Sequence, residues 1–263
     1  MSNLTVRQKP SRRCRTGTVR SVCGRFVSTS TPEQIAEYFG ASFEGDALAP
    51  SYSVAPTNDI YAVVRDEGEP RAVRAFHWGL VPVWAKDTKI GSSMINARAE
   101  TLSEKPSFKG LLRKRRCIIP IDGFYEWQAA VAGAPLSPKG KPIKRPMFIH
   151  RVNGEPLAVA GLWSIWRDKA GPPDGAWLHS CTIITTSANA TMLPVHERMP
   201  VILGAESWDE WLDPANDDPD TLKLLLRPAP DDVLTMHAVS TQVNNVRNKG
   251  PELIEPIRPI DLV

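Results

Sequence analysis

The chain has 263 residues, of which 42% are hydrophobic and 23% are charged, and its formal net charge is +3. This composition fits one compact domain or at most two small ones, and no run of about 18 apolar residues exists that could cross a membrane. The 24 prolines disfavour long helices and favour short strands joined by fixed loops.

The first 22 residues differ in composition from the rest of the chain. They carry six basic residues and no acidic one, which is typical of a disordered extension. They lack the apolar core of a secretory signal peptide. The remaining residues have a small net negative charge, so a nucleic acid would have to bind through a local basic patch.

The four cysteines indicate neither a metal site nor a disulfide framework. Cys14, Cys23, Cys117 and Cys181 are too widely spaced for a zinc site. A reducing cytoplasm is the compartment that such scattered cysteines favour. Cys117 and Cys181 lie in apolar runs, which predicts that both are buried.

The first folded element is predicted to be a helix that begins after Thr31. Thr31 can act as the N-cap, Pro32 suits the first turn, Gln34 completes a capping box and Gly40 can end the helix. Eight β-rich runs separated by turn residues follow along the chain, at 60–65, 72–78, 117–121, 124–127, 147–151, 157–162, 182–186 and 233–237.

Helical segments are fewer, at 105–113, 207–212 and 220–226, and loops are expected at 130–144 and 166–175. Long helices do not alternate with strands, which argues against a doubly wound parallel sheet. The predicted class is therefore α/β of the α+β type, with a β-rich, mainly antiparallel, barrel-like sheet and flanking short helices.

Polar residues embedded in apolar or turn sequence mark five candidate functional segments. They are Cys23-Gly24-Arg25-Phe26, residues 78–84 with two tryptophans, residues 95–100 with Asn96 and Arg98, residues 123–127 around Glu126, and residues 195–200 around His196. Each segment alone is a weak signal.

Together, and with residues 52–56 and 246–253, these segments resemble the SRAP family (SOS response-associated peptidase). The resemblance extends from about Cys23 to Pro256. We therefore expect an SRAP domain at 23–258, with an SRAP fold, behind the extension at 1–22.

The resemblance implies a covalent trap for abasic sites in single-stranded DNA. In the family, an N-terminal cysteine closes a thiazolidine on the ring-opened aldehyde, and a transient imine can support weak abasic-site lyase activity. By position, the catalytic residues would be Cys23, Asn96, Glu126 and His196. The DNA-binding residues would be Arg25, Trp78, Trp84 and Arg98. No metal or organic cofactor is implied, and we expect a monomer.

The physical chemistry of an N-terminal cysteine supports this expectation independently. An α-amine is partly neutral near pH 8 and can attack an aldehyde. The thiol of the same residue is then tethered beside the imine carbon, so ring closure is intramolecular. Glutamate and histidine can move the protons, aromatic faces can stack unpaired bases, and arginines can contact phosphates.

The chain departs from the family pattern because 22 residues precede Cys23. An internal cysteine has no free amine. Either Val22 is the true start, encoded by an alternative start codon, or residues 1–22 are a propeptide removed by autoproteolysis. We favour the first explanation.

Structural interpretations of the same residues stay open. Glu126 can face solvent or the interior of its strand. Asn96 and Arg98 share one strand face and can simply be hydrogen-bonded to each other, and Glu100 can pair with Arg98. The basic run 113–116 can be a DNA patch or a solvated face, and the two tryptophans can belong to the core.

Three other functions also remain open. A cysteine peptidase would use Cys23 as nucleophile and His196 as base, and would cleave peptides in trans. A non-catalytic reader of modified cytosine would bind reversibly without Cys23. A degenerate family member would keep its extension and form no crosslink.

Overall fold

The structure is a computed structural model that describes residues 23–257, except 131–132, 138, 170–171 and 173–174. The predicted extension at 1–22 lies outside the described residues. No described helix is long and apolar enough to cross a membrane.

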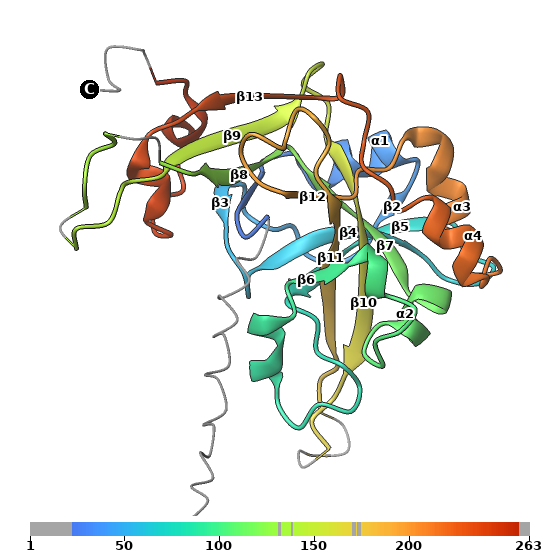
Figure 1. The fold of residues 1–263 in the computed structure, drawn as a ribbon. Coiled ribbons are helices and arrows are strands. Elements are labelled where there is room, and N and C mark those ends of the chain that lie inside the picture. Colours follow the sequence, from blue (N-terminus) through green and yellow to red (C-terminus); the bar gives the residue numbers. More distant parts are fainter. Residues whose placement is uncertain (1–22, 131–132, 138, 170–171, 173–174, 258–263) are drawn as a thin grey trace, which may run out of the picture.

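Five strands close into a barrel (Figure 1). Neighbouring strands pair antiparallel around the ring, except where β5 and β11 pair in parallel through Ser180 with His77 and Cys181 with Trp78. The prediction of a barrel-like, mainly antiparallel sheet is confirmed. In ring order the strands are β4 (Asp59–Arg65), β5 (Arg71–Trp78), β11 (Leu178–Ser187), β10 (Leu157–Trp166) and β7 (Arg116–Ile121).

A second, five-stranded antiparallel sheet lies across one end of the barrel, at the top of Figure 1. Only Asp122 separates its strand β8 from barrel strand β7, so the chain passes directly from one sheet to the other. In sheet order the strands are β13 (Leu234–Ala238), β9 (Arg145–Arg151), β8 (Gly123–Gln128), β1 (Phe26–Ser28) and β3 (Ser51–Val54). Three short strands extend the barrel sheet: β2 (Ser42–Phe43), β6 (Asn96–Arg98) and β12 (Arg198–Pro200).

The helices are short and flank the barrel, as predicted. The Thr31 capping box begins the first of them, and Gly40 ends it in the left-handed conformation. The α-helices are α1 (Pro32–Phe39), α2 (Lys109–Lys114), α3 (Trp208–Leu212) and α4 (Pro219–Leu224). Short 3-10 helices lie at 88–93, 99–101, 205–207, 241–244 and 251–254.

Strand β4 shows how the core is divided. Ile60, Ala62 and Val64 lie in a cluster that fills the barrel and continues to the second sheet, whereas Tyr61 and Val63 pack in the cluster under the helices. Both faces of the strand are buried, which explains why its sequence is almost continuously apolar. Cys117 and Cys181 are fully buried in the first cluster, as predicted.

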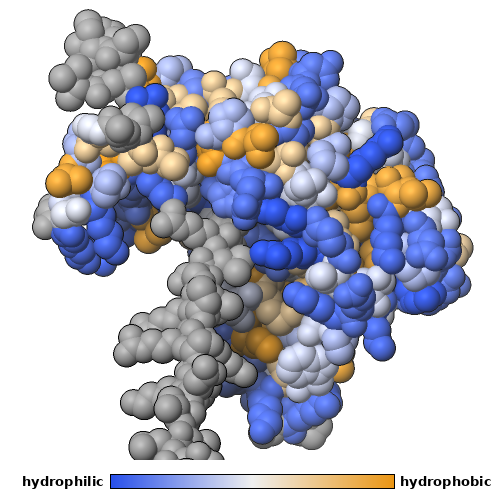
Figure 2. All heavy atoms as spheres, viewed as in Figure 1, coloured by the Kyte–Doolittle hydropathy of each residue, from blue (hydrophilic) through white to orange (hydrophobic). Residues whose placement is uncertain are grey.

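The C-terminal segment covers the outer face of the second sheet. Val243 and Leu253 pack there against Val27 and Tyr125, and the Tyr125 hydroxyl donates a hydrogen bond to the Tyr52 carbonyl at 2.8 Å. Figure 2 shows one face of the molecule, on which hydrophilic side chains predominate and hydrophobic ones form small separate patches.

A close backbone contact fixes the start of the long loop after β5. Gly79 has a φ of 137°, and a Cβ built on it would lie 2.7 Å from the Gly91 carbonyl oxygen. We expect Gly79→Ala to destabilise the fold by about 2–4 kcal/mol, because the backbone conformation and the neighbouring peptide both resist a side chain.

Gly68→Ala is the matched control for this prediction. Gly68 also has a positive φ, 77°, but nothing lies within 4 Å of its added Cβ. Its substitution should cost only the backbone strain, about 1–2 kcal/mol. Equal losses for the two variants in urea unfolding would show that the Gly79–Gly91 contact does not matter.

Candidate active site

The backbone nitrogen of Cys23 points at a buried carboxylate. Cys23 is fully buried and has a φ of 52°, a left-handed conformation that is uncommon for a residue with a side chain. Its N–H donates a hydrogen bond to Oε1 of Glu126 at 2.5 Å. The two residues meet because β1 pairs with β8, with Phe26 opposite Phe124.

The Glu126 side chain points from its strand into the interior of the protein. It is 5% exposed, whereas its neighbour Tyr125 packs on the opposite side of the sheet. Burial raises the pKa of Glu126 to about 7, although hydrogen bonds from the Cys23 and Trp127 backbones and the charge of Lys144 act in the opposite direction. A carboxyl with this pKa can both accept and donate a proton near neutral pH.

The Cys23 thiol is held in its neutral form. Burial, and secondarily the charge of Glu126, raise the pKa of the thiol well above its ordinary value. A thiolate that attacks at neutral pH is therefore disfavoured in this environment. The nitrogen of Cys23, rather than its sulfur, is the group that the carboxylate contacts.

Asn96 and Arg98 lie on one face of β6, as the sequence predicts. Strand β6 pairs in parallel with β11, and Ala97 between them is buried on the other face. Asn96 is half-buried and Arg98 is exposed. Ile95, the residue before β6, belongs to the same core cluster as Cys23.

His196 lies in the loop between β11 and β12 and is half-buried. Its backbone N–H donates to the Met192 carbonyl at 3.0 Å, and its Nδ1 accepts the backbone N–H of Arg198 at 3.0 Å. Because Nδ1 is an acceptor, the neutral ring carries its proton on Nε2. Met192 also belongs to the core cluster around Cys23.

The direct partner of Glu100 is Arg198, and the charge of Arg98 acts on Glu100 only as a smaller contribution. The Glu100 carboxylate accepts two hydrogen bonds from Arg198, at 2.6 and 3.0 Å, and these hydrogen bonds are the main reason that the pKa of Glu100 is lowered. Arg198 also donates to the Thr185 carbonyl at 2.7 Å. This bidentate contact joins the His196 loop to the turn that follows β6, and nothing in the local sequence marked it.

The two tryptophans proposed to stack on DNA bases lie in different environments. Trp78 is fully buried, its ring packs 4.9 Å from that of Phe26, and its Nε1–H donates to the Ile95 carbonyl at 3.1 Å. It has no exposed ring face for a base and acts as a core residue. Trp84, in the loop after β5, is 56% exposed.

Arg25 is buried rather than open to solvent. It is 8% exposed, and its guanidinium donates to the Ser53 hydroxyl at 2.9 Å and to the Val243 carbonyl at 3.0 Å. Burial lowers its pKa. In this structure Arg25 connects β1 to β3 and to the C-terminal segment, so its guanidinium is already engaged by protein groups.

The basic run 113–116 does not form a single patch. Arg116 is 4% exposed and donates to backbone carbonyls that include those of Trp211 and Leu112. The Arg113 guanidinium donates to the Asp217 carbonyl. The Arg115 guanidinium stacks 4.6 Å over the Trp163 ring. Structural contacts therefore account for much of this charge run.

Among the described residues, no group of three or more His, Cys, Asp or Glu side chains could hold a metal ion. The direct contact that defines the site is the one between Cys23 and Glu126. Asn96 and His196 are linked to Cys23 only through the core cluster, to which Ile95 and Met192 belong; Ile95 precedes Asn96, and the Met192 carbonyl accepts the backbone N–H of His196.

Comparisons with known proteins match nearly the whole described chain. A family model described as SOS response associated peptidase (SRAP) matches residues 22–246. The abasic site processing protein YoqW of Bacillus subtilis (strain 168) is 46% identical over 237 residues, covering 89% of this chain and 99% of the relative. The abasic site processing protein HMCES of Pongo abelii is 33% identical over 246 residues, covering 81% of this chain and 66% of the relative.

Solved structures show the same fold. A Bacteroides thetaiotaomicron protein superimposes with a TM-score of 0.76 at 24% identity, covering 90% of this chain and all of that one. A phage-related protein of Bordetella bronchiseptica does so with a TM-score of 0.61 at 31% identity, covering 82% and 94%.

The raised pKa of Glu126 predicts how stability depends on pH in the chain that retains residues 1–22. The folded-state pKa, about 7, exceeds the ordinary value of 4.5. The protonated carboxyl therefore supports folding at low pH, and this contribution is lost as the pH rises through 7. We expect Glu126→Gln to gain stability relative to the wild type between pH 5 and pH 8, by up to about 3 kcal/mol.

Urea unfolding at a series of pH values measures this difference. Glu210→Gln, which changes an exposed carboxyl on α3, should track the wild type throughout. A wild-type protein and a Glu126→Gln variant with parallel pH profiles would contradict a raised pKa at Glu126.

Proposed function

The chain belongs to the SRAP family, and from this membership and the geometry at Cys23 we propose that it processes abasic sites in single-stranded DNA by trapping them covalently on Cys23. The observation that carries the proposal is the 2.5 Å contact between the Cys23 nitrogen and the Glu126 carboxylate. The names of the relatives YoqW and HMCES, both abasic site processing proteins, support the choice of lesion.

The proposed reaction begins with Cys23 as the first residue of the mature chain. Its neutral α-amine attacks the aldehyde of the ring-opened abasic sugar, and the resulting carbinolamine loses water to give an imine. The thiol then adds across the C=N bond: sulfur bonds to the carbon, and the thiol proton passes to the nitrogen. The product is a thiazolidine, and no oxidant or cofactor is consumed.

Glu126 moves the protons of these steps in this proposal. It accepts a proton from the attacking nitrogen and returns one to the hydroxyl that leaves as water. Its pKa of about 7 suits both transfers near neutral pH. Because the thiol is buried and neutral, it adds as S–H after the imine has formed, in an intramolecular step with a high effective concentration.

The other site residues have positioning and binding roles in this proposal. Asn96 orients the amine, and His196 offers Nε2–H as a donor to the sugar oxygen while Nδ1 is held by the Arg198 backbone. Arg98 and Trp84 are exposed and contact phosphate and base. We assign structural roles to Trp78 and Arg25, which pack and hydrogen-bond within the protein.

A free amine at Cys23 requires that residues 1–22 be absent from the active protein. Initiation at codon 22 followed by removal of the initiator methionine meets this requirement, and so does autoproteolysis before Cys23. The imine can also undergo β-elimination, so we propose weak abasic-site lyase activity as a side reaction. The burial and raised pKa of the thiol argue against a general cysteine peptidase, which needs an accessible thiolate.

Crosslinking to DNA tests the proposal. A chain that begins at Cys23 should form an adduct with single-stranded DNA containing one abasic site, and the adduct should survive denaturing gel electrophoresis and show the expected intact mass. Cys23→Ala should abolish it, because neither sulfur nor ring closure remains. The chain that keeps residues 1–22 should form no stable adduct unless those residues are removed.

Cys181→Ala is the matched control, since it removes a buried thiol from the barrel core without touching Cys23. It should retain the adduct, provided that a thermal melt shows it to be folded. An undiminished stable adduct in Cys23→Ala would overturn the thiazolidine. Reversible binding of modified cytosine by that variant would instead support a non-catalytic reader.

A further inference from the structure

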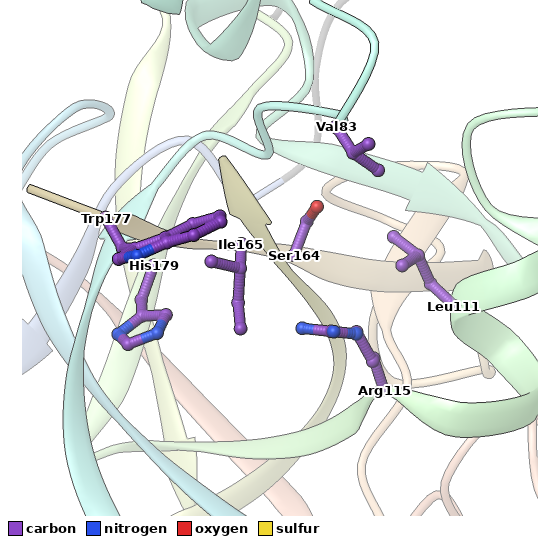
Figure 3. A pocket seen from close by; sticks show the side chains of 7 residues that line it. All are labelled: Val83, Leu111, Arg115, Ser164, Ile165, Trp177 and His179. Atoms are coloured by element: carbon purple, nitrogen blue, oxygen red, sulfur yellow. The ribbon is translucent and has the colours of Figure 1, made fainter. Parts of the chain in front are cut away.

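A second feature of the chain is a pocket of about 520 Å³ beside the end of the barrel (Figure 3). It lies between the loop after β5, helix α2, the end of β10 and the start of β11. The residues that line it are Val83, Leu111, Arg115, Ser164, Ile165, Trp177 and His179. The mechanism proposed above uses none of them.

The pocket has unusually exposed apolar walls. Trp177 and Val83 are each 59% exposed, and Trp84, next to Val83 in the chain, is 56% exposed. Large apolar side chains that gather in one exposed region mark a binding surface more often than scattered ones do. The Arg167 guanidinium lies 4.9 Å over one face of the Trp177 indole, and the opposite face of this exposed ring suits a planar ligand ring.

The polar groups of the pocket add a specific requirement. Figure 3 shows the side chains of Arg115 and Trp177 pointing toward one another from opposite sides. Within the described part of the chain, Nη1 of Arg115 is buried without a hydrogen-bond partner. A buried donor of this kind calls for an acceptor from a ligand.

His179 completes this polar set without adding charge at neutral pH. Its pKa is lowered, first by burial and then by the charges of Arg74 and Arg115. The neutral imidazole can donate one hydrogen bond and accept another. A flat ring with acceptor atoms on its edge, carried on an anionic chain, fits this combination, whereas an aliphatic side chain would leave the guanidinium nitrogen unpaired.

We propose that this pocket holds an unstacked nucleobase of the DNA strand whose abasic site is bound at Cys23. The proposal rests on the proposed function. The loop after β5 connects the pocket to the segment that carries Asn96. It contributes Val83 to the pocket and then continues through Trp84 to Asn96.

The strand geometry limits which base can reach the pocket. His179 and Ile183 lie four residues apart on β11, and Ile183 pairs with Asn96. Four strand residues span about 13 Å, which corresponds to about four nucleotides at B-form spacing and to fewer when the strand is extended. Because Asn96 orients the Cys23 amine in the proposed mechanism, the captured base lies about two to four nucleotides from the lesion.

Equilibrium binding in the Cys23→Ala background tests the pocket without crosslinking. Fluorescence anisotropy would measure binding of 15-nucleotide strands that contain one stable abasic analogue. One strand keeps all its other bases, and the others also lack the bases two to four nucleotides from the analogue, on its 5′ side or on its 3′ side. We expect Trp177→Ala to weaken binding of the strand that keeps all its other bases by about 5- to 100-fold. Trp177→Phe should retain most of the wild-type affinity.

A double-mutant cycle decides whether the contact is with a base. For the strand that lacks the captured base, the Trp177→Ala variant and its parent should have the same affinity. A loss of the same size on every strand, or no loss on any strand, would overturn the proposal. Leu224→Ala, which removes an exposed apolar side chain on α4, should bind every strand like its parent.

The crosslinking assay separates this proposal from the one it rests on. A chain beginning at Cys23 that carries Trp177→Ala should still crosslink a three-nucleotide strand centred on an abasic site, because that strand is too short to reach the pocket. If the Cys23 chemistry itself fails, no variant crosslinks at all, whereas the anisotropy cycle still reports on base capture.

Discussion

The hydrogen bond between the Cys23 nitrogen and Glu126 is the interaction on which the candidate site depends. It joins a residue just before the first strand to one in the middle of the second sheet, and it places a carboxyl inside a core that otherwise disfavours charge. The same burial that costs stability raises the pKa of Glu126 to about 7, where proton transfer is effective. The cost to the fold and the benefit to the chemistry therefore have one physical cause.

Much of the fold follows from local sequence. The capping box at Thr31 and the apolar runs of the barrel strands predicted elements that the structure places within a few residues of their expected ends. The short strands β1, β2, β3 and β12 were not among the predicted runs, because segments of two to four residues carry too little periodicity. Their strand conformation comes from pairing with other strands, as β1 does with the distant strand β8.

The candidate site residues were chosen by resemblance, which did not predict their environments in the fold. Successive side chains of a strand point to opposite faces, and the sequence does not say which face is buried in the barrel core. Glu126 could therefore have pointed to either side. The packing of Tyr125 on the outer face of the sheet decides between them. Trp78 and Trp84 look alike in sequence, yet one ends a barrel strand inside the core and the other lies in a loop. The Arg198–Glu100 contact joins segments almost 100 residues apart, and no local sequence pattern predicts such a pair.

Barrel closure has a consequence for the timing of biosynthesis. Strands β5 and β11 pair through residues more than 100 positions apart, and β6 adds to β11 rather than to a strand near it in sequence. Contacts of such high sequence separation form slowly and late. Residue 23 leaves the ribosome long before the barrel can close, because closure waits for β11, the last strand of the ring to be made. A nascent chain that ends before β11 leaves one edge of β10 without its partner strand and open to pairing with another chain, so correct folding depends on the completion of synthesis.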